Sequence, residues 1–203
     1  WEYINIDDGW EAPERTKGGE ILSNDKFPDF KALTDYIHGL GLKFGIYSSP
    51  GATTCGGHVG SYQHEEIDAR TWERWGVDYL KYDYCGYLDI EKDSKEETIQ
   101  EPYIVMRNAL DKVKRDIVFC VGYGAPNVWN WAAEAGGNQW RTTRDITDEW
   151  NVVTAIGTFQ DVCADATAPG RNNDPDMLVV GKLGQGWGSK VASIDEMTNM
   201  ILT

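Results

Sequence analysis

Hydrophobic and polar positions along the chain form two alternating patterns. Short runs rich in β-branched and aromatic residues predict strands, and longer runs with apolar positions three or four residues apart predict helices. The predicted strands lie at residues 3–7, 43–48, 78–83, 117–121, 139–144 and 177–180. The predicted helices lie near residues 30–40, 65–75, 98–114, 127–135, 148–156 and 191–203. Because strands and helices alternate, the pattern predicts an α/β fold with a parallel sheet and right-handed crossovers.

Repeating strand–helix units of this kind fit either a doubly wound sheet or part of an eight-stranded barrel. No Gly-x-Gly-x-x-Gly motif and no phosphate-loop motif follows a predicted strand, which removes the usual cofactor reason for a doubly wound sheet. In both architectures, ligands bind at the carboxyl ends of the strands. Polar residues gather at those ends, at Asp7, Asp8, Tyr47, Ser48, Asp83, Tyr123 and Asp145. The sequence therefore predicts one shared binding mouth.

Composition and charge narrow the classes of partner. The chain has 203 residues, of which 41% are hydrophobic and 26% charged, and this is typical of one globular domain with a sizeable core. The net charge of −14 argues against nucleic acid or an anionic membrane as a partner, because like charges repel. No stretch approaches the roughly 18 apolar residues of a membrane span. A neutral ligand such as a sugar is compatible with this charge.

Two aspartates, each at the end of a predicted strand, suggest the chemistry of the mouth. Asp83 ends the run YLKYD and Asp145 ends WRTTRD. Hydrolysis of a glycosidic bond needs one carboxyl group to protonate the leaving oxygen and a second, ionised one to attack or stabilise the sugar carbon, and neither role needs a metal or another cofactor. Residues two apart in a strand share a face, so Lys81 accompanies Asp83 and Arg141 accompanies Asp145. The alternative is that these acids form surface ion pairs or begin helices, as ITDEW after Asp145 suggests.

Six motifs in order resemble family 27 of the glycoside hydrolases, the α-galactosidases and α-N-acetylgalactosaminidases. They are INIDDGW (4–10), GLKFGIYSSPG (41–51), CGGHVGSYQHEEIDA (55–69), WGVDYLKYDYC (75–85), WRTTRDI (140–146) and NDPDMLVVG (173–181). The resemblance implies a (β/α)8 barrel, followed in the family by a small β-domain. It also implies that residues 1–203 form part of a single catalytic barrel, covering about strands two to seven, with the first and last strands and the β-domain absent from this chain. The alternative is a naturally shortened homologue.

The resemblance also implies the role of each site residue. Asp83 corresponds to the nucleophile and Asp145 to the acid/base of a double displacement that retains configuration. Asp7 and Asp8 correspond to carboxylates that bind the 4- and 6-hydroxyls of a terminal galactose, on an oligosaccharide or a glycoconjugate. The other substrate-binding positions are Tyr47, Cys55, Lys81, Cys85, Gly122, Tyr123, Arg141 and Asp176. The resemblance pairs Cys55 with Cys85 in a disulfide on the pocket wall, which implies a secreted, periplasmic or lysosome-like location.

One departure from the family pattern concerns sugar specificity. After the fourth predicted strand, α-galactosidases usually carry an acid or amide that binds the 2-hydroxyl, whereas this chain has Gly122 and Ala125 there. Small residues at these places would admit the larger 2-acetamido group of N-acetylgalactosamine, because an acetyl group needs volume. The equal alternative is that Gly122 is a turn residue and that another side chain fills the space.

Other readings remain open at this point. The chain could be a carbohydrate-binding barrel without catalysis, a family relative with another specificity such as a β-L-arabinopyranosidase, or a sugar isomerase that binds a metal through Asp7, Asp8, Asp83 and Asp176. Four cysteines without a C-x-x-C motif argue against a zinc site. We expect Cys120 to be a buried thiol and Trp10, near the mouth, to contact the ligand.

Overall fold

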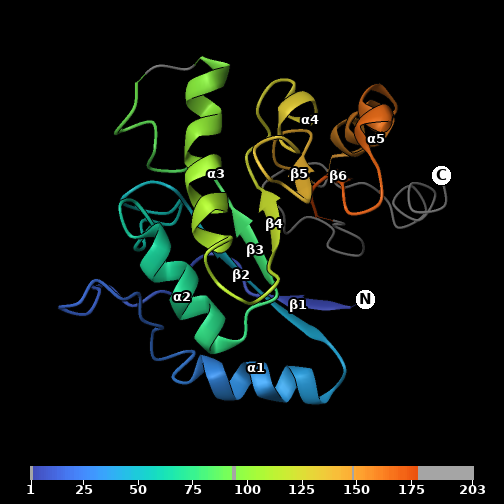
Figure 1. The fold of residues 1–203 in the computed structure, drawn as a ribbon. Helices are drawn as coiled ribbons and strands as arrows, with labels where there is room; N and C mark the ends of the chain where they lie inside the picture. Colours follow the sequence, from blue (N-terminus) through green and yellow to red (C-terminus); the bar gives the residue numbers. More distant parts are fainter. Residues whose placement is uncertain (1, 93–94, 148, 178–203) are drawn as a thin grey trace. The chain divides into compact units, whose positions relative to one another are not determined.

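The structure, a computed structural model, describes residues 2–92, 95–147 and 149–177 (Figure 1). The chain divides into two compact units. The first comprises Trp1–Gly122 and Ala132–Asn138, and the second comprises Tyr123–Trp131 and Gln139–Thr203. Among the described residues, no helix is both long and apolar enough to cross a membrane.

Four parallel strands form the sheet of the first unit. They are β1 (Tyr3–Asn5), β2 (Lys43–Ser48), β3 (Tyr79–Tyr82) and β4 (Val118–Val121), each paired with the next along the chain. Tyr47 of β2 lies opposite Lys81 of β3, which lies opposite Cys120 of β4. Residues opposite each other in a sheet share a face, so these three side chains line the same face. Asp83 comes two residues after Lys81 and extends that row beyond the end of β3.

Three helices cover the other face of this sheet, namely α1 (Phe30–Gly39), α2 (Glu65–Trp75) and α3 (Glu96–Leu110), and they follow one another side by side along it (Figure 1). Helix α1 begins at Phe30 because the side chain of Asp29 accepts a hydrogen bond from the amide of Ala32 at 2.9 Å. Aromatic rings join helices to strands: Phe30 packs on Phe44 and Tyr103 packs on Phe119. The hydrophobic core therefore lies between helices and sheet, which leaves the face of Tyr47 and Lys81 for polar groups.

The second unit contains α4 (Val128–Trp131), β5 (Gln139–Arg141), α5 (Trp150–Phe159), the 3-10 helix η1 (Gln160–Ala166) and β6 (Asn172–Asp174). Strands β5 and β6 pair in parallel, with Trp140 opposite Asn173. Trp140 is fully buried, and its indole N–H donates a hydrogen bond to Oδ1 of Asn173 at 2.7 Å. A buried indole that has found its acceptor fixes the register of this strand pair.

The structure shows a strand that the sequence did not predict, Asn172–Asp174. Of the strand predicted at 177–180, Met177 is not in a strand and residues 178–180 lie outside the described part of the chain. The residues of Asn172–Asp174 are polar, so hydrophobic alternation does not reveal this strand. Parallel backbone pairing with β5 defines this strand. The predicted strand 139–144 also ends earlier, at Arg141, and the predicted helix at 191–203 lies outside the described residues.

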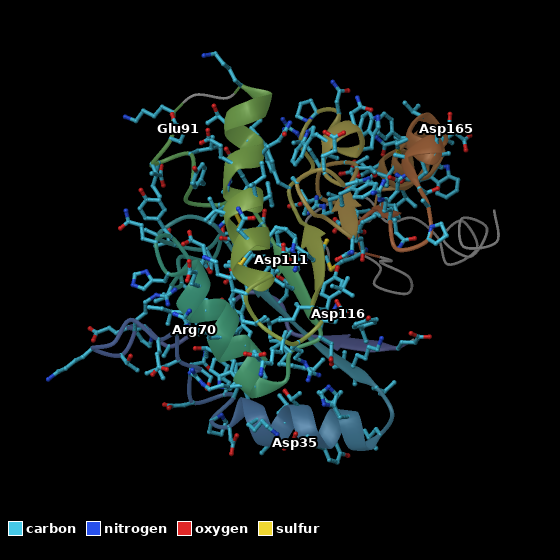
Figure 2. The ribbon with its side chains drawn as sticks, viewed as in Figure 1. Asp35, Arg70, Glu91, Asp111, Asp116 and Asp165 are labelled. Atoms are coloured by element: carbon cyan, nitrogen blue, oxygen red, sulfur yellow. A yellow bond between two sulfur atoms is a disulfide. The ribbon has the colours of Figure 1, made fainter. Side chains whose placement is uncertain are left out.

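Many charged residues lie on the exposed surface of helices and connecting segments. Figure 2 labels the acids Asp35, Asp111, Asp116 and Asp165 among them, together with the cation Arg70. These charges are solvated and need no functional explanation. The acids that remain to be explained are those at the carboxyl ends of the strands.

Candidate active site

Asp83 follows β3 and is held by both its backbone and its side chain. Its amide donates to the carbonyl of Ser48 at 2.9 Å, and its carbonyl accepts a hydrogen bond from the hydroxyl of Tyr103 at 3.1 Å. Its carboxylate accepts the amide N–H of Tyr84 at Oδ1 (2.8 Å) and the hydroxyl of Tyr47 at Oδ2 (2.9 Å). Two donors to a half-buried carboxylate favour its charged form and fix its direction.

Tyr47 is the donor that aims Asp83. The Tyr47 side chain is buried, and burial together with the negative charge of Asp83 raises its pKa far above the ordinary value for tyrosine. Tyr47 is therefore protonated near neutral pH. Its hydroxyl remains a hydrogen-bond donor to the Asp83 carboxylate.

The disulfide expected between Cys55 and Cys85 is present, and it closes over Asp83. Sγ of Cys55 lies 3.3 Å from Oδ2 of Asp83 and 3.1 Å from the Tyr47 hydroxyl. Among the described residues, Cys55, Asp83 and Cys85 form the one group of three side chains whose ligand atoms are close enough for a metal ion. Because the two sulfurs are bonded to each other, they offer no thiolate. Cys120 is a buried free thiol, as expected.

Asp7 and Lys81 meet on the same face of the sheet. The ammonium of Lys81 lies 2.7 Å from Oδ2 of Asp7 and 5.4 Å from the centre of the Tyr47 ring. The sequence predicted that Lys81 shares a face with Asp83, and the structure shows an ion pair of Lys81 with Asp7, which follows β1. The Asp7 side chain is 57% exposed, so the pair can rearrange around a ligand.

Asp8 is held by a residue that the sequence reasoning missed. The amide of Gly56 donates to Oδ2 of Asp8 at 2.6 Å. A Cβ at position 56 would lie 2.9 Å from that same oxygen, so only glycine brings its N–H this close. The glycine pair after Cys55 was the available signal, but a sequence does not show which backbone group a glycine exposes.

Trp10 and Glu11, which follow Gly9, complete this turn. Glu11 is 2% exposed, and its Oε2 accepts the amide N–H of Gly9 at 3.1 Å. Burial raises the pKa of Glu11 to about 7, and the charge of Asp8 adds to the effect. Trp10 was expected to contact the ligand, and this was wrong: it is fully buried and its indole N–H donates to the carbonyl of Tyr47 at 2.9 Å.

The second unit holds the other predicted carboxylates. Arg141 is buried, and its guanidinium donates to Oδ1 of Asp145 at 2.7 Å; the two side chains meet, although Asp145 lies beyond the end of β5 and not on a face of that strand. Asp176 has a φ of 76° and accepts the amide N–H of Ile146 at 2.8 Å, while its Oδ1 lies 3.8 Å from Nε of Arg141. A non-glycine residue in this backbone region is strained and often functional. Tyr123, also predicted, is half-buried in this unit.

Gly122 lies close to the backbone at the end of β3. A Cβ there would lie 3.0 Å from the carbonyl oxygen of Tyr82 and 3.4 Å from Cα of Asp83. The missing side chain therefore points at the end of β3. Glycine at this position is therefore explained by the close approach of two strand ends, a reason that neither of the two sequence-based alternatives named.

Known proteins resemble this chain over most of its length. The family model described as Alpha galactosidase A matches residues 1–201. The chain is 44% identical over 190 residues to "Alpha-galactosidase" of Cyamopsis tetragonoloba, which covers 91% of this chain and 44% of that protein.

Solved structures also resemble this chain. A Bacteroides fragilis protein described as an alpha-galactosidase/melibiase is 39% identical with a TM-score of 0.91, over 98% of this chain and 44% of its own. Alpha-galactosidase I of Mortierella vinacea is 35% identical with a TM-score of 0.84, over 91% of this chain and 52% of its own. The fold is thus that of part of a (β/α)8 barrel, as expected, and the chain spans about half the length of these relatives.

Proposed function

The chain belongs to the Alpha galactosidase A family of glycoside hydrolases, and on that basis we propose that the protein hydrolyses terminal α-linked galactose from galacto-configured oligosaccharides or glycoconjugates. The observation that carries the proposal is the environment of Asp83. It is a half-buried carboxylate with two hydrogen-bond donors, at the end of a strand and beside an Asp7–Lys81 ion pair. A carboxylate so held suits attack on a sugar carbon, because the two donors favour its charged form and fix its direction.

In the proposed mechanism, Asp83 attacks the anomeric carbon while Asp145 donates a proton to the leaving oxygen. Asp145 then removes a proton from water, which hydrolyses the glycosyl–Asp83 ester with retained configuration. We propose that residues 1–203 form part of one catalytic domain; a retaining mechanism requires the two carboxyl groups of such a domain to lie about 5–5.5 Å apart. Arg141, which binds Asp145 at 2.7 Å, would stabilise the carboxylate that remains after the proton has left.

Sugar recognition is assigned to the groups around Asp83. Asp7 and Asp8 would accept hydrogen bonds from the 4- and 6-hydroxyls of galactose, and Lys81 would donate to a ring hydroxyl. A site built from such charged partners rejects a sugar that lacks the hydroxyl, because a buried group is then left unpaired.

The disulfide is relevant to the cellular compartment in which the protein acts. Disulfides persist in oxidising compartments and are rare in the cytosol. The Cys55–Cys85 bond lies against the nucleophile candidate, so we propose a secreted, periplasmic or lysosome-like location.

The decisive experiment traps the glycosyl intermediate. The intact protein is incubated with a 2-fluoro α-galactosyl substrate, and mass spectrometry of its peptides is expected to show a covalent adduct on Asp83. Asp83→Asn should lower turnover of nitrophenyl α-galactoside by roughly 10³-fold or more. Asp89→Asn, which changes an exposed aspartate of the same segment, should leave turnover unchanged. An adduct on another residue, or normal turnover by Asp83→Asn, would contradict the assignment.

Two further comparisons separate the alternatives. Asp145→Asn should slow substrates with poor leaving groups far more than nitrophenyl substrates, and added azide should restore turnover, because azide attacks the glycosyl–Asp83 ester in place of water and needs no general base. Rates on nitrophenyl α-galactoside, α-N-acetylgalactosaminide and β-L-arabinopyranoside identify the sugar. A carbohydrate-binding protein without catalysis would bind galactose and turn over none of them.

A further inference from the structure

The turn that presents Asp8 contains a second acid with an unusual environment. In each of the two acids, one carboxyl oxygen accepts a backbone N–H: Gly56 donates to Asp8, and Gly9 donates to Glu11. The other oxygens, Oδ1 of Asp8 and Oε1 of Glu11, are buried and have no hydrogen-bond partner within the described part of the chain. A buried oxygen without a donor is costly, and more so when it is charged.

Glu11 also helps to hold this turn in place through hydrogen bonds. Its carboxyl holds the amide of Gly9, while the Asn24 side chain donates to the carbonyl of Gly9 at 2.8 Å and the Asn24 amide donates to the carbonyl of Trp10 at 2.9 Å. Asp8 directly precedes Gly9 in the chain. A shift of Glu11 would therefore move the backbone that aims the Asp8 carboxylate.

The charges around Glu11 determine how costly the ionisation of its carboxyl group is. Burial raises the pKa of Glu11 to about 7, and Asp8 raises it further by repelling a second negative charge. Glu11 lies in the wall of a cavity of about 550 Å³, and His58 is the other titratable residue of that wall. No lysine or arginine is among the residues that line it. No side chain of this wall carries a permanent positive charge that would offset the charge of Glu11 once it loses its proton.

Metal binding is the competing explanation for two acids near a histidine. The structure does not favour it: among the described residues, Asp8, Glu11 and His58 do not bring their ligand atoms within 4.8 Å of one another. An ion held by all three would need shorter separations.

We propose that Glu11 is a positioning residue for sugar binding. As a neutral acid it leaves the Asp8 carboxylate undisturbed, and its ionisation places a second buried negative charge beside Asp8, which repels that carboxylate and weakens the affinity for the sugar. The inference rests on the proposed function, since it takes Asp8 as a sugar-binding group. It adds a residue that does not touch the sugar and a pH limit on affinity that does not involve the two catalytic carboxyls.

The test is the affinity of the intact protein for galactose as a function of pH, measured by isothermal titration calorimetry. For the wild type, the dissociation constant is expected to rise about tenfold between about pH 5.5 and about pH 8.5, which corresponds to ~1.4 kcal/mol. Glu11→Gln keeps an oxygen for the Gly9 amide and cannot ionise, so its dissociation constant should stay nearly constant. Glu65→Gln, at another acid whose pKa burial raises, is the matched control and should follow the wild type.

The outcomes distinguish a positioning role of Glu11 from a role in packing alone. Glu11→Ala loses both the hydrogen bond and the titration, so it should bind weakly at every pH. It also serves as a second variant if Glu11→Gln does not fold. A wild-type affinity that does not change with pH would overturn the inference alone, as would a pH dependence that persists in Glu11→Gln. Galactose that binds at no pH would overturn the proposed function and this inference with it.

Discussion

Arg15 is expected to stabilise the protein far more than an ordinary surface arginine. Its guanidinium binds both carboxylate oxygens of Asp68, at 2.6 and 2.8 Å, and it also donates to the carbonyls of Gly19 and Gly60. The Asp68 side chain has no exposed surface, and that of Arg15 is 12% exposed. Burial raises the pKa of Asp68, and the charge of Arg15 opposes this rise. Arg15→Met would leave a buried carboxylate without its partner.

The size of the effect follows from this burial. Removing one partner of a buried ion pair costs ~3–5 kcal/mol, because the remaining charge stays desolvated. A neighbouring pair supplies the control: Arg74 lies 2.7 Å from Glu20, with side chains 55% and 45% exposed. Exposed pairs contribute less than ~1 kcal/mol, so Arg74→Met should lower the free energy of unfolding by no more than this.

Urea unfolding of the intact protein near neutral pH, followed by circular dichroism, measures both variants. The double variant Arg15→Met/Asp68→Asn should lose less free energy of unfolding than the two single variants predict together, because it no longer buries an unpaired charge. Equal losses in Arg15→Met and Arg74→Met would refute the reasoning, since the two pairs differ mainly in burial.

Three further predictions concern the site. The pKa of Glu11 is raised, so the folded state holds its proton more tightly than the unfolded chain: the free energy of unfolding should fall by roughly 3 kcal/mol as pH rises from 4.5 to about 7, and Glu11→Gln should remove this slope in urea unfolding. Tyr47→Phe removes the hydroxyl that donates to the carboxylate of Asp83, so kcat/KM for an α-galactoside should fall roughly tenfold or more; an unchanged value would show that the bond does not aim the nucleophile. Reduction of the Cys55–Cys85 bond should lower the free energy of unfolding by ~2–4 kcal/mol and reduce activity in parallel, as dithiothreitol titration with an activity assay would show.

The sequence predicted the first unit well because its signals are local. Strands β2, β3 and β4 are apolar runs between helices, and they lie within a residue of the predicted bounds. The cluster of Tyr47, Lys81 and Asp83 followed from the rule that parallel strands bring their carboxyl ends to one edge. Neither inference needed knowledge of a particular contact.

The misses share a different cause, since each depends on a partner far away in the chain. Trp10 is buried because its indole finds the carbonyl of Tyr47, 37 residues later. Lys81 pairs with Asp7, 74 residues earlier, and no spacing along one strand reveals a partner on another. Gly56 acts through its backbone N–H, which every residue type except proline carries. The polar strand β6 exists through backbone pairing that a hydrophobic pattern does not record.

One loop links the groups proposed to bind the sugar to the group proposed to attack it. Within residues 49–61, the amide of Gly56 binds Asp8, Sγ of Cys55 contacts the Asp83 carboxylate, and the carbonyl of Gly60 accepts a hydrogen bond from Arg15. A change that loosens the whole loop should therefore disturb both acids. Arg15→Met should raise KM and lower kcat together for any substrate that the protein turns over. The Glu11 carboxyl group binds the amide of Gly9 in the turn of Asp8, so its ionisation should raise KM and leave kcat nearly constant. The two patterns distinguish a loop that carries both acids from a turn that carries one.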